Sequence, residues 1–316
     1  MPAGVRVGIV SWNTAELLDR CLAALPEALD GTKAWIVVVD NASDDGSADV
    51  ACSHPGVEVI RNSANVGYAK AINQALTHNA EEVVPSALIA LNPDTVAPPK
   101  SLRMLVERLL EDPSVGLVAP RLENPDGTAQ HSVYRFPSPT VSAMASFVPL
   151  RWQRKLIGPD WWLETASEPD RRCDIDWAIG GVHVLRPESV NTSQPYSERW
   201  FMYAEDLDLC WRMAQAGWRR RLEGDVVVVH KGNAAGSQAW GPLRTERWLT
   251  ATYEWYQSTR GRMAVRVWAL INLAGAGVRL TGSLFRHLHG RPTQDWERDV
   301  RRSLPIHARV LVPARP

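Results

Sequence analysis

The chain has 316 residues, of which 45% are hydrophobic and 22% charged, and this length favours one large α/β unit with a small appendage. Its 21 Gly and 22 Pro are spread along the sequence, which excludes a collagen-like repeat and a broadly disordered protein. Lys and Arg balance Asp and Glu at 35 each, and this zero net charge argues against a nucleic-acid-coating role.

The strands and helices are predicted from the spacing of apolar residues. Strands are expected at 5–11, 35–39, 57–61, 87–91, 115–119 and 226–229, and helices at 15–25, 68–79 and 102–110. Most of the strands are continuous apolar runs, as is usual when both faces of a parallel sheet are covered by helices. The sequence therefore predicts an α/β fold with a mostly parallel central sheet.

Polar residues follow four of these strands. The clusters are Ser11-Trp12-Asn13, Asp40-Asn41, the segment 62–65 and Asn92-Pro93-Asp94. Turn chemistry alone explains any one such cluster, but four in register indicate a ligand site, because open sheets bind ligands beyond the carboxyl ends of their strands. No G-x-G-x-x-G lies between the first strand and helix, and no Walker lysine motif occurs, so dinucleotide and P-loop sites are disfavoured.

The charge is unevenly divided along the chain. From Trp240 to Pro316 there are 13 Arg and 5 acidic residues, a net charge of +8, so residues 1–239 carry −8. Four widely spaced cysteines form neither a C-x-x-C pair nor a disulfide scaffold, which favours a reduced protein in the cytoplasm. The N-terminal segment does not reach the length of a secretory signal, so export is not expected.

Six segments, taken in chain order, resemble the inverting GT-A glycosyltransferases of family 2, and within them the rhamnosyltransferase-like branch. They are VSWN at 10–13, VVVDNASDDGS at 37–47, NSANVGYAKAINQ at 62–74, LNPDT at 91–95, WAIGGVHVLRP at 177–187 and RWFMYAEDLDLCWRMAQAGW at 199–218. The resemblance covers about residues 5–238. It implies a GT-A domain over 1–239, with a nucleotide-sugar-binding half at 1–125 and an acceptor and catalytic half at 126–239. Residues 240–316 would form a basic helical extension.

The resemblance implies a nucleotide-sugar donor, dTDP- or UDP-linked, with dTDP-L-rhamnose favoured by the branch. The residues expected to bind it are Ser11, Trp12, Asn13, Asp40, Asn65, Asn92 and Asp94. Asp40 would accept a hydrogen bond from the imide N–H of the base, which suits a carboxylate because it only accepts. Trp12 and Asn65 would contact the base and ribose.

Asn92-Pro93-Asp94 occupies the place of the family's D-x-D motif, with Asn in place of the first acid. The resemblance implies that Asp94 and His230 bind Mg²⁺ or Mn²⁺, which would bridge the diphosphate. With one carboxylate fewer, a modest affinity for the metal is expected. The D-x-D sequences at 174–176 and 206–208 do not follow the relevant strand, so we do not expect either to bind metal.

Glu205-Asp206 matches the family's E-D motif at the start of a predicted helix. Asp206 would take the proton from the acceptor hydroxyl, with Glu205 orienting it or the acceptor. The structural alternative is that acids at a helix N-terminus only complement the helix dipole. Trp177, Gly180 and Gly181 are expected on the acceptor side.

The C-terminal region is predicted to form helices at 245–257 and 263–289. Residues 267–284 contain one charge, Arg279, but Asn272 and three glycines make membrane insertion marginal. One hypothesis is that the arginines dock this region on the anionic inner face of the cell membrane, where it presents a polyprenyl-linked acceptor. The other is a homodimer or core-capping helix pair.

The leading hypothesis is a metal-dependent inverting glycosyltransferase that modifies a glycan or lipid-linked acceptor in cell-envelope polysaccharide assembly. A tailoring glycosyltransferase that acts on a soluble metabolite is a second hypothesis. A catalytically silent GT-A module that binds nucleotide-sugars is a third, although retention of the acidic and histidine residues disfavours it.

Overall fold

The computed structural model describes residues 4–79, 84–148, 152–153, 155, 171–232, 241–289, 292 and 295–312. The chain forms two compact units. The sheet unit comprises Met1–Tyr134 and Trp162–Gln238, and the helical unit comprises Arg135–Trp161 and Ala239–Pro316. The predicted boundary after residue 239 falls outside the described residues. However, residues 135–161 group with the helices, whereas the sequence places them in the acceptor half of the GT-A domain.

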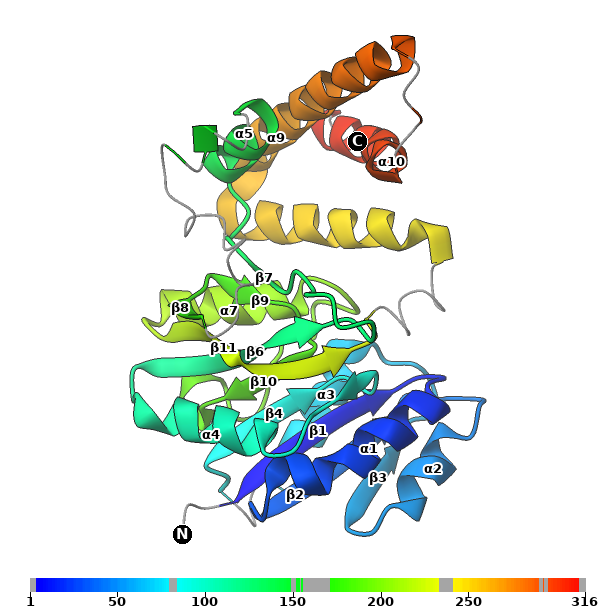
Figure 1. The fold of residues 1–316 in the computed structure, drawn as a ribbon, viewed down its shortest axis with the longest axis vertical. Helices are drawn as coiled ribbons and strands as arrows, with labels where there is room; N and C mark the ends of the chain where they lie inside the picture. The colour runs from blue at the N-terminus through cyan, green and yellow to red at the C-terminus, as the bar shows by residue number, and fades with distance from the viewer. Residues whose placement is uncertain are drawn as a thin grey trace. The chain divides into compact units, whose positions relative to one another are not determined.

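The sheet unit is built on a nine-stranded mixed sheet (Figure 1). Its strands are β1 (Val5–Ser11), β2 (Ala34–Asp40), β3 (Val57–Arg61), β4 (Ala87–Leu91), β5 (Thr95–Val96), β6 (Val115–Glu123), β8 (Arg172–Asp174), β10 (Val182–Leu185) and β11 (Arg219–His230). The order across the sheet is β3-β2-β1-β4-β10-β6-β11-β5, with β8 beside β11. A second sheet pairs β7 (Val133–Tyr134) with β9 (Trp177–Ala178).

Strands β3, β2, β1 and β4 run parallel to their neighbours, as the alternation of strands and helices predicts. The exception that matters for the site is β10, which the sequence did not predict and which runs antiparallel between β4 and β6. It follows Gly180 and Gly181 directly, and Val182 pairs with Leu91 at the end of β4. This insertion brings the two glycines to the carboxyl edge of the parallel strands.

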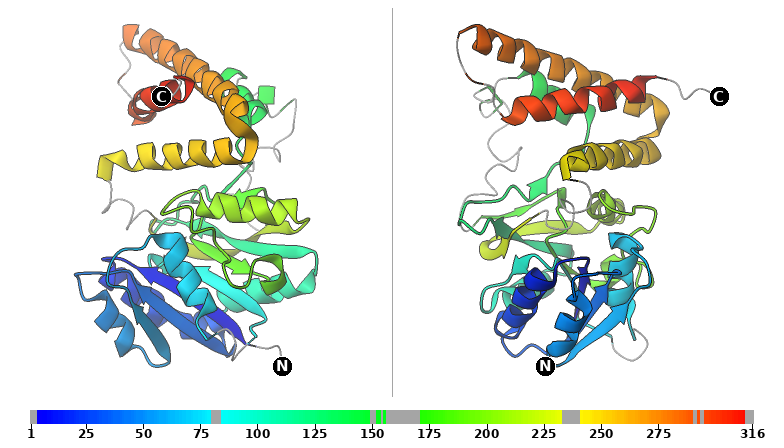
Figure 2. Two further views of the ribbon diagram at one scale, coloured as in Figure 1. Left: turned by 180° about the vertical axis from the view of Figure 1, so that it is seen from behind. Right: turned by 90° about the vertical axis from the view of Figure 1, so that its right-hand side faces the viewer.

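Helices cover both faces of this sheet (Figures 1 and 2). They are α1 (Ala15–Leu29), α2 (Ser47–Ser53), α3 (Tyr68–Thr77), α4 (Ser101–Glu111) and α7 (Glu205–Gln215), with a 3₁₀ turn at Pro187–Ser189. Leu18 and Leu25 of α1 share a buried cluster with Ile9 of β1. A Cβ on the adjacent Gly8 would lie 2.9 Å from Ala75 of α3. Because successive strand residues point to opposite faces, α1 and α3 cover opposite faces.

The helical unit contains α5 (Pro139–Phe147), α9 (Arg244–Leu288) and α10 (Asp295–Leu311), with a 3₁₀ turn at Gly241–Leu243 before α9. Gly261 has φ 85° and ψ 170°, so α9 is two helical segments separated by a kink (Figure 2). This arrangement confirms the two helices predicted at 245–257 and 263–289. The third helix, α10, was not predicted.

Helix α5 packs directly on α9, which explains why residues 135–161 group with the helical unit. Trp268 Nε1 donates a hydrogen bond to Ser142 Oγ at 2.7 Å. A Cβ on Gly275 would come within 2.4 Å of Ser146 Cβ, so the two helices touch at this glycine. Close approach of two backbones needs a glycine at the contact.

Among the described residues, one helix is long and apolar enough to cross a membrane, Arg244–Phe285. Its most apolar 18-residue window has a mean hydropathy of 1.3, and 28% of that window is buried. Core helices of soluble proteins meet the same criteria, so length and composition alone do not assign a membrane span here. Because α9 is kinked at Gly261, its apolar residues lie mainly in the second helical segment, 262–288.

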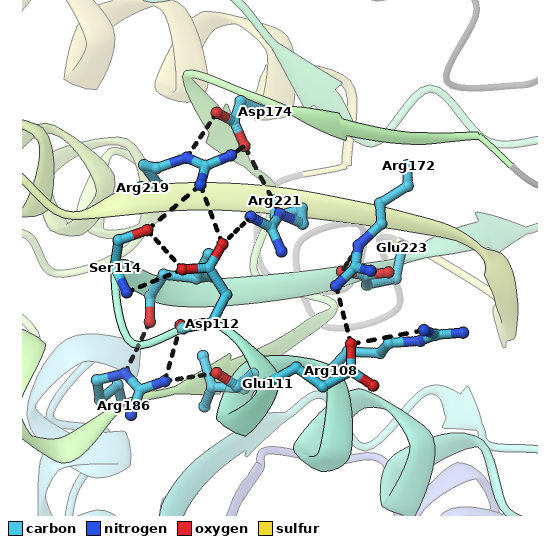
Figure 3. A network of polar contacts seen from close by, with 12 residues as sticks. Arg108, Glu111, Asp112, Ser114, Arg172, Asp174, Arg186, Arg219, Arg221 and Glu223 are labelled. Atoms are coloured by element: carbon cyan, nitrogen blue, oxygen red, sulfur yellow. Dashed lines mark hydrogen bonds and ion pairs between the residues drawn. The ribbon is translucent and has the colours of Figure 1, made fainter.

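Ion pairs hold the first residues of β11 in place (Figure 3). Arg219 donates to both carboxylate oxygens of Asp174 at 2.8 and 3.0 Å, and Arg221 donates to Asp112. Hydrogen bonds from Ser114 and Arg221 hold the pKa of Asp112 well below its usual range. Asp174 therefore serves an ion pair with Arg219. The network anchors the strand that carries the predicted metal-binding histidine at its other end.

Candidate active site

The predicted base-binding carboxylate, Asp40, lies at the end of β2 beside Ser11 at the end of β1. Asp40 is 4% exposed; its Oδ2 atom accepts a hydrogen bond from Ser43 N at 3.2 Å. Its Oδ1 atom is buried and has no hydrogen-bond partner among the described residues. A buried acceptor without a donor is unfavourable by about 1–3 kcal/mol, so this atom is suited to receive an N–H from a ligand.

Three of the other predicted donor-binding residues hold the loops around Asp40 together. Ser11 Oγ is 2.8 Å from Thr14 Oγ1, and Asn13 Oδ1 accepts a hydrogen bond from Asp44 N at 2.8 Å. Asn65 Oδ1 accepts from Asn41 Nδ2 at 2.9 Å and from Gly67 N at 3.0 Å. These oxygens already have partners in the protein, so their side chains position the loops. Trp12 is half-buried at the same strand end.

The two predicted metal ligands, Asp94 and His230, lie together. His230 Nε2 is 3.2 Å from Asp94 Oδ1, and both side chains are buried. His230 Nδ1 lies 2.7 Å from Gln130 Oε1, which can only accept, so Nδ1 carries the hydrogen. The Nε2 atom makes no hydrogen bond of normal geometry although it lies close to the carboxylate. An imidazole lone pair and a carboxylate oxygen that converge in this way fit a divalent cation.

No third His, Cys, Asp or Glu side chain joins this pair in the described part of the chain. Mg²⁺ and Mn²⁺ commonly take their remaining ligands from substrate phosphates and water, so two protein ligands suffice for a substrate-assisted site.

Asn92, which was predicted to bind the donor, anchors the loop before Asp94. Its backbone N–H donates to Gly181 O at 3.0 Å, and its carbonyl accepts from Thr95 N at 3.2 Å. Its backbone therefore links this loop to the glycines before β10.

The acid pair begins α7 after a strained turn. Tyr203 and Ala204 have φ values of 69° and 67°, which is unusual for two successive residues other than glycine. Strain of this kind persists only where the surroundings impose it, and it is concentrated at functional sites. The turn directs the Asp206 carboxylate to the predicted glycine pair, where Oδ2 accepts from Gly180 N at 3.2 Å. Oδ1 accepts from Leu207 N at 2.7 Å.

Burial sets the protonation of this pair. It raises the pKa of Asp206 from 3.8 to about 6, although hydrogen bonds from the backbone of Leu207 and Gly180 oppose the shift. Burial raises the pKa of Glu205 well above its ordinary value, and the negative charge of Asp206 raises it further. Two adjacent carboxylates resist ionising together, so Asp206 ionises before Glu205. Asp206 retains some exposed surface, which a base needs to reach a substrate hydroxyl.

Tyr68, which the sequence did not single out, begins α3 next to the turn that precedes the acid pair. Its hydroxyl is buried and has no hydrogen-bond partner among the described residues. Burial raises its pKa, and the charges of Glu205, Asp206 and Asp94 raise it further. Its backbone N–H donates to Phe201 O at 2.8 Å, which joins the start of α3 to the strained turn.

The three residues predicted on the acceptor side lie in or next to the short strands before α7. Trp177 is buried and stacks on Tyr134 with ring centroids 4.8 Å apart. A Cβ on Gly181 would lie 2.8 Å from Leu122, whereas one on Gly180 would meet nothing within 4 Å. Gly181 is therefore required for packing, and Gly180 contributes its N–H. Asp208 pairs with Arg212 at 2.8 Å, one helical turn further along α7.

Solved structures show the class of fold. A mannosyltransferase from Pyrobaculum calidifontis in complex with GDP-Man and Mn²⁺ matches with a TM-score of 0.55 at 18% identity, covering 98% of this chain and 86% of that one. GalNAc-T7 with UDP, GalNAc and Mn²⁺ matches with a TM-score of 0.50 at 15% identity, over 83% of this chain and 52% of that one. The mixed, mostly parallel sheet flanked by helices is a GT-A fold, followed by a C-terminal helical region.

Sequence comparison supports one family of glycosyltransferases. The sequence pattern of Glycosyl transferase family 2 matches residues 6–160. The N-acetylglucosaminyl-diphospho-decaprenol L-rhamnosyltransferase of Mycobacterium tuberculosis is 27% identical over 282 residues, 81% of this chain and 89% of the relative. A low-salt glycan biosynthesis hexosyltransferase, Agl10 of Haloferax volcanii, is 27% identical over 57% of this chain and 53% of its own. The match to the family pattern, the similarity to the mycobacterial relative and the GT-A fold together support a family 2 glycosyltransferase that resembles the rhamnosyltransferases.

Proposed function

We propose that the protein is a metal-dependent inverting glycosyltransferase that transfers L-rhamnose from dTDP-L-rhamnose to a polyprenyl-diphosphate-linked sugar. The observation that carries the catalytic part is the partly buried, hydrogen-bonded Asp206 carboxylate, whose pKa of about 6 suits a base near neutral pH. The donor and acceptor are inferred from the mycobacterial relative, whose name specifies rhamnosyl transfer to a decaprenyl-diphosphate-linked N-acetylglucosamine.

At the donor end, Asp40 would read the nucleobase. A pyrimidine base such as thymine or uracil presents an imide N–H, and Asp40 Oδ1 is a buried acceptor without a protein donor. The loops that hold Asp40 are already fastened by Asn13 and Asn65. Binding the base would therefore satisfy an existing acceptor with little rearrangement of these loops.

At the reacting end, Asp206 would take the proton from the acceptor hydroxyl as that oxygen attacks the anomeric carbon. Glu205 would stay protonated and present an O–H donor beside it. A divalent cation bound by Asp94 and His230 would neutralise charge on the departing diphosphate. Direct attack by the acceptor from the side opposite the diphosphate inverts the anomeric configuration, and this step needs no nucleophile from the protein.

The full-length protein can be tested with dTDP-L-rhamnose and a short-chain polyprenyl-diphosphate N-acetylglucosamine, with Mn²⁺, Mg²⁺ or EDTA. We expect a disaccharide lipid whose new linkage has the configuration opposite to that of the donor, and no product in EDTA. The linkage is determined by NMR of the isolated product. A product of retained configuration would contradict the single displacement.

The same assay separates the other hypotheses. A tailoring enzyme would transfer the sugar to a soluble acceptor and leave the polyprenyl-linked one unchanged. A silent module would bind the nucleotide-sugar and release no diphosphate with either acceptor. A parallel reaction with UDP-linked sugars shows whether the enzyme recognises its donor by the nucleobase or by the sugar.

A further inference from the structure

The second segment of α9 exposes an unusual apolar face. Six large apolar side chains on it are 53–75% exposed, and we call them the apolar stripe: Met263, Leu270, Val278, Leu284, Phe285 and Leu288. They recur at helical spacing on one side of the helix, and Val267, Ala274 and Thr281 on the same side are uncharged. At about 1.5 Å per residue the stripe is roughly 38 Å long. A face of this kind on a water-soluble helix ordinarily marks an interaction surface.

The opposite side of the same helix is packed inside the helical unit. Val265, Trp268, Ala276 and Ser283 are buried, and Trp268 donates to Ser142 of α5. Asn272 Nδ2 donates to the Tyr253 hydroxyl, which contacts His307 of α10 at 2.7 Å. A membrane-spanning position would carry the packed helix α10, with its exposed Arg301, Arg302 and Arg309, into the bilayer, where charged side chains are costly. The structure therefore favours a helix that lies along a surface over one that crosses a membrane.

The charge of the helical unit indicates which surface this is. Its two segments contain 17 basic and 6 acidic residues, a net charge of +11, whereas the sheet unit carries 18 basic and 29 acidic residues, a net charge of −11. Arg301, Arg302 and Arg309 of α10 are exposed. An interfacial helix with an apolar face and neighbouring arginines is typical of binding to anionic lipid.

We propose that the helical unit docks in the plane of an anionic lipid surface, with the apolar stripe among the acyl chains and the α10 arginines on the headgroups. This inference does not depend on the sugar that is transferred. It concerns where the enzyme works, and any transferase with this helical unit would bind the same surface.

The test is flotation of the full-length protein with vesicles of phosphatidylcholine, with and without one third phosphatidylglycerol, and without polyprenyl lipid. We expect the protein to float with the anionic vesicles and to be released by alkaline carbonate. The Leu270→Asp/Phe285→Asp variant should lose at least tenfold in binding. Its matched control, Gln257→Glu/Ser258→Asp, adds the same charge at exposed positions before the kink and should lose much less. Arg301→Gln/Arg302→Gln should weaken binding by about 25-fold, since each arginine near an anionic surface contributes about fivefold.

Far-UV circular dichroism and thermal melting show that each variant is folded, so a loss of binding reports on the surface alone. No flotation of the intact protein with anionic vesicles would overturn the proposal. Flotation only when polyprenyl lipid is added would overturn it too, because the stripe would then bind the acceptor's tail. A third result would also overturn it: the intact protein sediments as a dimer, the stripe variant sediments as a monomer, and the two float equally well. The apolar stripe would then be a dimer interface. Resistance to carbonate would contradict the in-plane orientation.

Discussion

The sheet unit and the helical unit depart from the usual distribution of side chains in opposite directions. The sheet unit buries ionisable groups, among them Asp40, Asp94 and Glu205. The helical unit exposes large apolar groups, among them Leu270 and Phe285. Each departure is unfavourable in isolation and would be offset by a ligand of matching character. The comparison supports our two proposals, a small charged substrate for the sheet unit and an extended lipid surface for the helical unit.

The largest expected effect is the loss of transfer activity when Asp206, in the acid pair at the start of α7, is replaced. Asp206→Asn keeps the size of the side chain and removes the base, so we expect transfer to fall by about 10²- to 10⁴-fold with the affinity for donor unchanged. The measurements are kcat and calorimetric donor binding. The control is Asp208→Asn, which removes an acid that pairs with Arg212, and we expect it to retain most activity. An equal loss of donor binding in Asp206→Asn would show that the base lies elsewhere.

The next largest effect is a loss of metal affinity when Gln130, the uncharged neighbour of His230, is replaced. Gln130→Leu removes the acceptor for His230 Nδ1, so the imidazole loses its orientation, and we expect Mn²⁺ affinity to fall by about 10- to 100-fold. Electron paramagnetic resonance titration measures free Mn²⁺ directly, without an activity assay. Gln130→Glu keeps an acceptor at this position and should bind metal much more tightly than the leucine variant. Unchanged affinity in Gln130→Leu would mean that His230 is not a ligand.

The third prediction concerns pH. With the pKa of Asp206 at about 6, activity should fall about tenfold for each pH unit below 6 as the base becomes protonated. The folded pKa lies above the ordinary value of 3.8, so the folded state binds this proton more tightly and ionised Asp206 destabilises the fold at neutral pH. Asp206→Asn should therefore melt at a higher temperature than wild type at pH 7. That difference should shrink as the pH falls from 6 to 4, and a constant difference would contradict the shift.

The smallest expected effect is a change in stability when a glycine of α9 is replaced, with opposite signs at a packed and at an open position. Gly275→Ala places a methyl group against Ser146, and we expect a loss of about 1–3 kcal/mol of stability from overpacking, partly offset by better helix propensity. Gly282→Ala meets nothing within 4 Å and should stabilise the helix by up to about 1 kcal/mol. Urea denaturation compares the two. Changes of the same sign would show that α5 does not pack on this face.

The sequence predicted the first half of the sheet and not its middle, for a physical reason. Strands β1 to β4 are segments of five to seven residues, continuously apolar or alternating, and helical periodicity separates them, which is a local signal. Strand β10 has four residues after Gly180 and Gly181, too few to show a period. Helix α10 was missed because Pro305 interrupts a run rich in arginine, so its buried side is hard to recognise.

The same reasoning applies to the site. The motif order predicted Asp94 and His230 and the segment that contains Asp206, and the structure brings the first two to 3.2 Å of each other. Gln130 lies 100 residues before its partner and reaches it through the pairing of β6 with β11, which no local pattern reveals. Tyr68 could have been found inside its motif, as the first residue of a helix that begins at a sheet edge.

The chain passes between the two units at residues 134–135, 161–162 and 238–239, and this path has a consequence during synthesis. Helix α5 leaves the ribosome long before Trp268 and Gly275, the residues that cover it. At about 5–20 residues per second, the delay of some 125 residues lasts roughly 6–25 s. Throughout that interval a short apolar helix is attached to a nascent sheet unit without its partner. We expect the nascent chain to need a chaperone in this window, and a truncation before α9 to aggregate rather than to yield a free sheet unit.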